Sequence, residues 1–138
     1  MRLSKITLAI GCFVLFSFLF FSPATSYSDQ PIIEIEIDVA PNVLNIQSEG
    51  TVVTVHTNIS YSHVEDHSTV TLNDIEISWW KEDNRGNFVA KFSMDEVKAL
   101  DDLTKGDYLL TLLGHTIDGA LFVGKQEILV IDVTPQGQ

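Results

Sequence analysis

The sequence predicts an all-β fold, an immunoglobulin-like sandwich of two antiparallel sheets with seven to eight strands and one short crossover helix. Three observations lead to this prediction. Apolar and polar residues alternate through most of the chain after residue 30, turn signals recur every eight to twelve residues, and only one short stretch has helical spacing. A parallel α/β fold is excluded because it would need a helix between successive strands.

The first five predicted strands come from segments with a period of two residues. From Ile33 to Val39, apolar residues alternate with glutamate or aspartate, and the sequence Ala-Pro-Asn ends the strand. In the fifth strand Trp79 has the parity of two isoleucines, so we expect Trp79 in the core and Trp80 on the surface. We place these strands at residues 32–39, 43–46, 51–59, 69–73 and 75–80.

The predicted helix follows a polar turn and a strand at residues 88–92. Residues 93–100 break the alternation, because Ser93 and Glu96 have the spacing of a capping box and apolar residues recur at helical intervals. We therefore expect one or two helical turns here, crossing from one sheet to the other.

The last two predicted strands, at residues 107–116 and 120–133, flank Asp118-Gly119, a strong hairpin signal. Both strands carry apolar residues on both faces. One parity supplies the core, and the other leaves large side chains where a solvent-exposed face is expected. If these side chains are contiguous, they mark a contact surface for a protein partner or for a homodimer. The candidate partner-binding residues are Leu109, Leu113, Leu129 and Ile131.

Residues 1–26 have the layout of a secretory signal peptide. Basic residues (Arg2 and Lys5) precede an uncharged run from Ile6 to Phe21, and small residues follow at the cleavage position. The alternative is an uncleaved anchor, but the run has 16 residues, fewer than the ~20 of a spanning helix, which favours the signal peptide. We expect residues 27–138 to form one exported domain without a membrane segment, in the periplasm, at the cell surface or outside the cell.

Cysteine content and charge exclude several classes of function. Cys12 is the only cysteine and lies in the signal peptide, which excludes disulfides, thiol catalysis and zinc–thiolate sites from the mature chain. Once Arg2 and Lys5 are removed, six basic residues face 19 acidic ones, which gives a net charge of −13. Such a surface repels phosphate backbones, so we expect no nucleic-acid partner.

Several short motifs occur in an order that resembles a family of small immunoglobulin-like domains of exported bacterial proteins. They are IEIDVAPNVLNI, QSEGTVVTVHT, TVTLN at Thr69 to Asn73, VAKF at Val89 to Phe92, LTLLG at Leu110 to Gly114, Asp118-Gly119, Phe122-x-Gly124 and Ile128-x-Val130. The resemblance covers nearly all of the mature chain. It implies a β-sandwich and no catalytic residues. Many members have an Asp/Asn/Gly-rich loop suggestive of calcium, where this chain has Arg85 instead.

Two segments contain candidate metal ligands. YSHVEDHS places His63, Asp66 and His67 close together in a connection between strands, where zinc or copper would need further ligands. Asp83 lies in KEDNRGN, but Arg85 takes a position that calcium would require for an oxygen ligand, and no closing acid follows. We interpret both segments as polar turns and expect no cofactor.

No catalytic motif stands out. The chain has no G-x-S-x-G elbow, and its paired carboxylates fall in turns or in the predicted helix. We therefore expect no enzyme, but an exported, acidic, non-catalytic module with a structural or protein-interaction role. The alternative is a small metal-binding protein of the periplasm or cell surface that takes zinc, copper or calcium.

Overall fold

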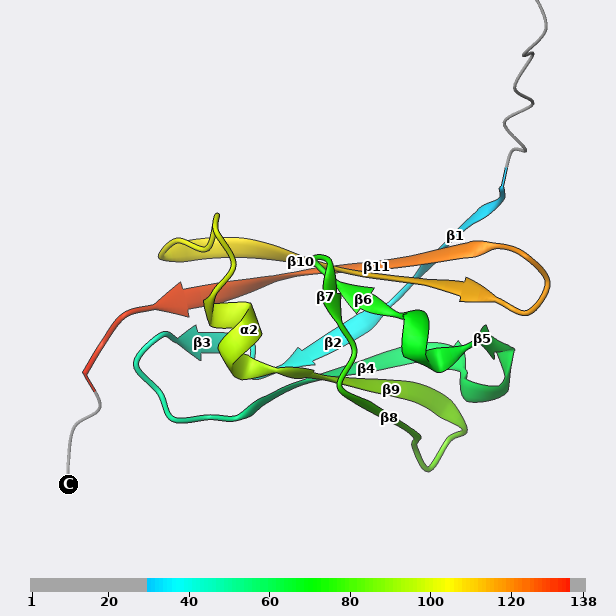
Figure 1. Cartoon of the computed structure of the whole chain (residues 1–138), viewed down its shortest axis with the longest axis horizontal. Helices are drawn as coiled ribbons and strands as arrows, with labels where there is room; N and C mark the ends of the chain where they lie inside the picture. Colours follow the sequence, from blue (N-terminus) through cyan, green and yellow to red (C-terminus); the bar gives the residue numbers. More distant parts are fainter. Residues whose placement is uncertain (1–29, 135–138) are drawn as a thin grey trace, which may run out of the picture.

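The computed structural model describes residues 30–134, which fold as a β-sandwich of two sheets (Figure 1). The all-β sandwich that the sequence predicts is confirmed. The predicted signal peptide, residues 1–26, lies outside the described residues. Within residues 30–134, no helix has the length and apolar character needed to cross a membrane.

The four-stranded sheet is antiparallel throughout. Its strands lie in the order β2-β4-β9-β8, so β2 and β8 form its edges. The register between β4 and β9 shifts between His56 and Ser60, where the regular strand pairing is interrupted. The four strands are β2 (Ile37–Ala40), β4 (Val52–Ser60), β9 (Asn87–Ser93) and β8 (Trp79–Glu82).

The seven-stranded sheet is built on the long hairpin β10–β11, which runs across the whole molecule (Figure 1). Two of its pairings differ from the purely antiparallel sheets that we predicted, because β1 and β3 both pair with β11 in parallel. The strands are β1 (Ile32–Ile35), β3 (Val43–Asn45), β5 (Val64–Glu65), β6 (Thr71–Leu72), β7 (Ile75–Glu76), β10 (Gly106–Thr116) and β11 (Leu121–Ile131).

The predicted first strand is in fact two strands in different sheets. β1 ends at Ile35 beside β11, and β2 begins at Ile37 beside β4. At the crossing, the backbone N–H of Glu36 donates to the side-chain oxygen of Asn58 at 2.9 Å. From β1 the chain crosses to the second sheet as β2 and returns to the first sheet as β3. Because no hairpin reverses the chain between β1 and β3, both strands run parallel to β11.

The core lies between the sheets and consists of the inward parity of the long strands. In β4 the buried positions alternate strictly with more exposed ones, as the sequence predicts. Thr57 and Thr116 are the buried polar residues, and among residues 30–134 no buried side-chain N or O lacks a hydrogen-bond partner. The largest fully buried side chains are Phe88, Phe92, Phe122, Leu44, Leu72, Leu110 and Leu112.

The predicted helix is confirmed and forms a single α-helix, α2 (Met94–Lys98). The Ser93 hydroxyl caps it by accepting a hydrogen bond from the Glu96 N–H at 3.4 Å. Met94 and Val97 are buried against the core, and the helix packs beside β4 and β9 (Figure 1).

The expectation that Trp79 is buried and Trp80 exposed is wrong. Trp79 is 52% exposed, whereas Trp80 is half-buried and packs against the core. The reason is a second crossing between sheets, because β7 belongs to the seven-stranded sheet and β8 to the other. The alternation that starts at Ile75 therefore does not carry through to β8.

Because Trp80 packs against the core and Trp79 does not, replacing each should change the stability by a different amount. We expect Trp80→Ala to lower the free energy of unfolding by about 2 kcal/mol, because a large, partly buried ring is lost from the edge of the core. Trp79→Ala should cost less than about 1 kcal/mol. Urea unfolding measures both losses, and equal losses would contradict the placement of the two rings.

Candidate functional site

The histidine-rich segment forms two short 3-10 turns, η2 (Tyr61–His63) and η3 (His67–Thr69), on either side of β5. His67 is packed rather than presented to solvent. Its ring stacks on Tyr61 with the centroids 4.1 Å apart, and its Nε2 donates to the Tyr61 carbonyl oxygen at 2.9 Å. The rings of Trp80 and Phe88 lie nearby, with centroids 6.4 and 5.5 Å from that of His67. The imidazole therefore packs at the edge of the core.

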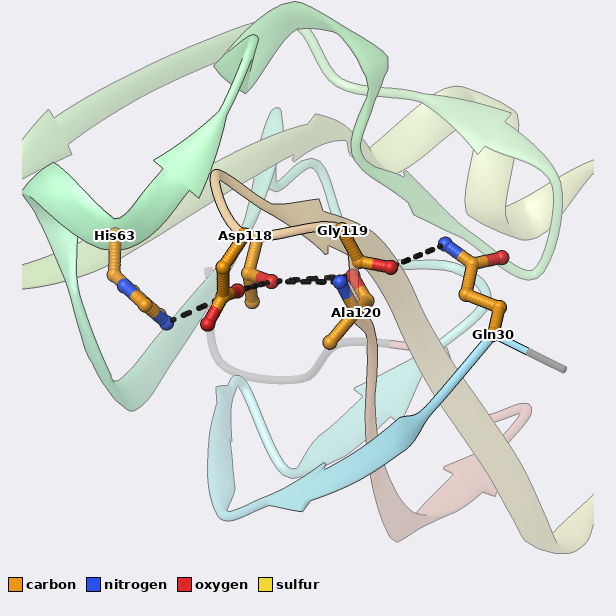
Figure 2. A network of polar contacts seen from close by, with 6 residues as sticks. Gln30, His63, Asp118, Gly119 and Ala120 are labelled. Carbon is orange, nitrogen blue, oxygen red and sulfur yellow. Dashed lines mark hydrogen bonds and ion pairs between the residues drawn. The ribbon is translucent and has the colours of Figure 1, made fainter. Parts of the chain in front are cut away.

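His63 belongs to a polar network at the tip of the β10–β11 hairpin (Figure 2). Its Nε2 lies 3.7 Å from Oδ1 of Asp118, which also accepts a hydrogen bond from the Thr116 hydroxyl. That hydroxyl is the main reason that the pKa of Asp118 is lowered from its ordinary value, and the nearby His63 lowers it further. On the other side of the turn, Gln30 donates to the Gly119 carbonyl oxygen at 3.2 Å.

The two candidate acidic ligands have roles in their own turns. Asp66 has positive φ, at 48°, and its carboxylate accepts from the N–H and the hydroxyl of Ser68, which caps η3. The Asp83 carboxylate accepts from the N–H groups of Arg85 at 2.8 Å and Asn87 at 2.9 Å. The bond from Asn87 is the main cause of the lowered pKa of Asp83.

The four candidate metal ligands thus have separate structural roles. His67 packs against other rings, His63 belongs to the hairpin network, and Asp66 and Asp83 each stabilise their own turn. In the described part of the chain, no group of three or more His, Cys, Asp or Glu side chains is arranged to hold a metal ion.

The outer face of the seven-stranded sheet carries the four candidate partner-binding residues, and the strand register separates Leu113 from the other three. Leu129 lies directly opposite Val43 on β3. Leu109 lies on β10 opposite Glu127, which is the outward residue of β11 next to Leu129. Ile131 is the next outward residue of β11 after Leu129. We call Val43, Leu109, Leu129 and Ile131 the apolar patch. Three of them are exposed, Val43 by 46%, Leu109 by 45% and Leu129 by 42%.

Leu113 does not join this patch, contrary to our expectation that the four side chains could merge. It pairs with Val123, and the pair formed by Thr111 and Lys125 separates it from Leu109. Four residues of strand correspond to about 13 Å. The sequence gives the correct parity for Leu113, but the distance along the hairpin keeps it apart.

A second surface, which the sequence did not predict, lies on the outer face of the four-stranded sheet. Trp79 stands there beside its cross-strand partner Lys91, whose Nζ lies 4.9 Å from the centroid of the indole ring. The next outward row along the sheet runs from Lys81 through Val89 and His56 to Asp38. These residues come from four strands, so no local motif could have joined them.

A shallow depression of about 590 Å³ opens beside this row, and we call it the polar basin. It is lined by residues of β2, β4, β8, the β8–β9 turn and the start of β9, including Asp38, His56, Lys81 and Arg85. Val89 is fully buried although it belongs to the outer parity of β9, so the side chains around it cover that part of the sheet. The lining includes three carboxylates, two cationic groups and three amides.

Comparison of the chain with protein-family models, with curated proteins and with solved structures gives no match.

Proposed function

We propose that this protein is an exported, non-catalytic β-sandwich that serves as a protein-interaction module. The observation that carries the proposal is the apolar patch, three members of which are between 42% and 46% exposed on regular strands. Large apolar side chains gathered on a sheet face gain free energy when a second surface removes them from water. The resemblance to small immunoglobulin-like domains and the predicted signal peptide support export.

Charge around the patch indicates the class of partner. Asp107 lies directly opposite Leu129, and Glu127 lies directly opposite Leu109. A second copy of this chain, docked through the same face, would bring its own two carboxylates close to this pair and cause repulsion. The proposed partner is therefore a different protein, whose contact surface combines apolar groups with basic ones.

The proposal can be tested with a defined probe, a synthetic amphipathic helix made of leucine and lysine. Titration of the isotope-labelled protein should shift backbone amide signals of β3, β10 and β11 near the patch. The double variant Leu109→Ser with Leu129→Ser should weaken binding by about tenfold or more, because two apolar anchors are lost.

Val52→Ser is the matched control, because Val52 is 38% exposed on the outer face of the other sheet. This variant should bind the peptide like the parent protein. Amide shifts scattered over the acidic surface, or unchanged affinity in the double variant, would contradict the proposal. Light scattering should show a monomer. A dimer that dissociates in the double variant would assign the patch to a second copy instead.

A further inference from the structure

The outer face of the four-stranded sheet combines an exposed aromatic ring with a polar basin. Trp79 is 52% exposed on an edge strand. The Lys91 ammonium lies over one face of the ring and restricts its orientation, so a stacked ligand would use the other face. The basin begins one outward row further along the same sheet, at Lys81. The two features therefore form one continuous strip along β8 and β9.

The basin offers both kinds of hydrogen-bonding group. Its carboxylates only accept, Lys81 and Arg85 only donate, and its amides do both. No carboxylate of residues 30–134 lies within 4.0 Å of the charged nitrogens of Lys81 or Arg85, since the single ion pair there joins His63 and Asp118. The donors of both cations are therefore free of acidic partners in this part of the chain and can reach a ligand.

The charge of the basin is nearly balanced in a strongly acidic protein. Three carboxylates and two cationic groups line it, whereas the mature chain has 19 acidic and six basic residues. A polyanion would meet the carboxylates, and a polycation would meet Lys81 and Arg85. A neutral ligand rich in hydroxyl groups suits this lining, because each hydroxyl both donates and accepts.

We propose that this strip binds a neutral polysaccharide chain, with one sugar stacked on Trp79 and the adjoining sugars hydrogen-bonded in the polar basin. The apolar face of a sugar ring complements the exposed indole, and its hydroxyls complement the mixed lining. Trp79 and Lys81 are two residues apart, about 7 Å along the strand, so the ligand must extend beyond a single ring. This site is independent of the apolar patch, which lies on the other sheet.

The site is held by backbone structure, which favours binding without rearrangement. Asp83 fixes the β8–β9 turn by accepting from two backbone N–H groups. The register shift between His56 and Ser60 interrupts the regular pairing of β4 and β9 beside the basin. Asn58 is anchored from β4 by accepting the N–H of Glu36 at 2.9 Å, which leaves its side-chain N–H groups for a ligand.

Affinity electrophoresis tests the proposal in gels that contain hydroxyethyl cellulose, xylan, galactomannan or, as the acidic comparison, polygalacturonate. At least one neutral polysaccharide should retard the protein, and polygalacturonate should retard it less. Trp79→Ala and Arg85→Ala should each weaken retardation by about tenfold. Leu129→Ala and Lys125→Ala are the matched controls on the other sheet and should change nothing.

Fluorescence supplies an independent measurement, because the chain has only two tryptophans. In the variant Trp80→Phe, Trp79 is the single reporter, and oligosaccharides of the retarding polysaccharide should shift its emission to shorter wavelength. The proposal is overturned if none of the neutral polysaccharides retards the protein, if polygalacturonate binds as strongly, or if Trp79→Ala binds like the parent. Substitutions that remove the apolar patch on the other sheet would leave all these results unchanged, so this proposal and the proposed protein-interaction function can fail separately.

Discussion

Replacing Phe122 by alanine is expected to lower the free energy of unfolding by about 3–5 kcal/mol. Phe122 is fully buried near the start of β11 and is among the largest core side chains. It lies opposite Gly114 on the neighbouring strand, and its ring covers the space where a Cβ of residue 114 would be. The loss therefore combines the transfer of an aromatic ring to water with a cavity that the rigid hairpin cannot close. Urea unfolding measures the effect.

The contact between the Phe122 ring and Gly114 also predicts the effect of Gly114→Ala in two backgrounds. In the parent protein the new methyl group would overlap the Phe122 ring, so the substitution should cost about 1–3 kcal/mol. In the Phe122→Ala background the methyl group enters the vacated space, and the cost should vanish or become a gain. A double-mutant cycle measures this coupling. Additive effects would mean that the ring does not lie over Gly114.

Asn73→Ala is expected to cost about 3–4 kcal/mol, because one residue supplies both a turn conformation and three hydrogen bonds. Asn73 has positive φ, at 46°, in the turn between β6 and β7. Its side-chain oxygen accepts from the Thr111 N–H at 2.7 Å, and its amide donates to the Leu109 carbonyl and to the Tyr108 hydroxyl, each at 3.1 Å. The side chain thus attaches the turn to β10.

Two further variants separate the contributions of Asn73. Asn73→Gly tolerates the positive φ and should recover about 1–2 kcal/mol of the loss. Asn73→Asp keeps the acceptor for Thr111 but removes both donors. Its stability should lie between those of the parent and Asn73→Ala. If glycine is no better than alanine in thermal or urea unfolding, the backbone conformation contributes little at this position.

The parts of the fold that local patterns encode were predictable from the sequence. The strict alternation of β4 and the cap of α2 by Ser93 and Glu96 each depend on residues a few positions apart. The crossings between sheets were not predictable in this way. Alternation continues unbroken from Ile33 to Val39 while the chain changes sheet at Glu36. Parity describes which face a residue takes within a strand, and it does not identify the sheet to which the strand belongs.

The candidate surfaces show the same limit. The parity of Leu109 and Leu129 was correct, but Val43 joins them only because β3 pairs with β11. In the polar basin, the expectation that Arg85 lies in a turn is confirmed, and His56 lies on the solvent-exposed face of its strand. The concavity between them depends on the strand order β2-β4-β9-β8, which involves residues far apart in the sequence.

The parallel pairing of β1 with β11 also has a mechanical consequence. β1 is the first described strand and β11 the last, and Figure 1 shows the two strands side by side, with the chain entering at one end of the sandwich and leaving at the other. Tension applied between Gln30 and Thr134 would slide the strands past each other, loading their inter-strand hydrogen bonds together rather than one after another. Breaking these hydrogen bonds together creates the barrier to unfolding under force, and the rate of crossing this barrier governs forced unfolding. A domain fastened in this way resists stretching when it is pulled between its ends.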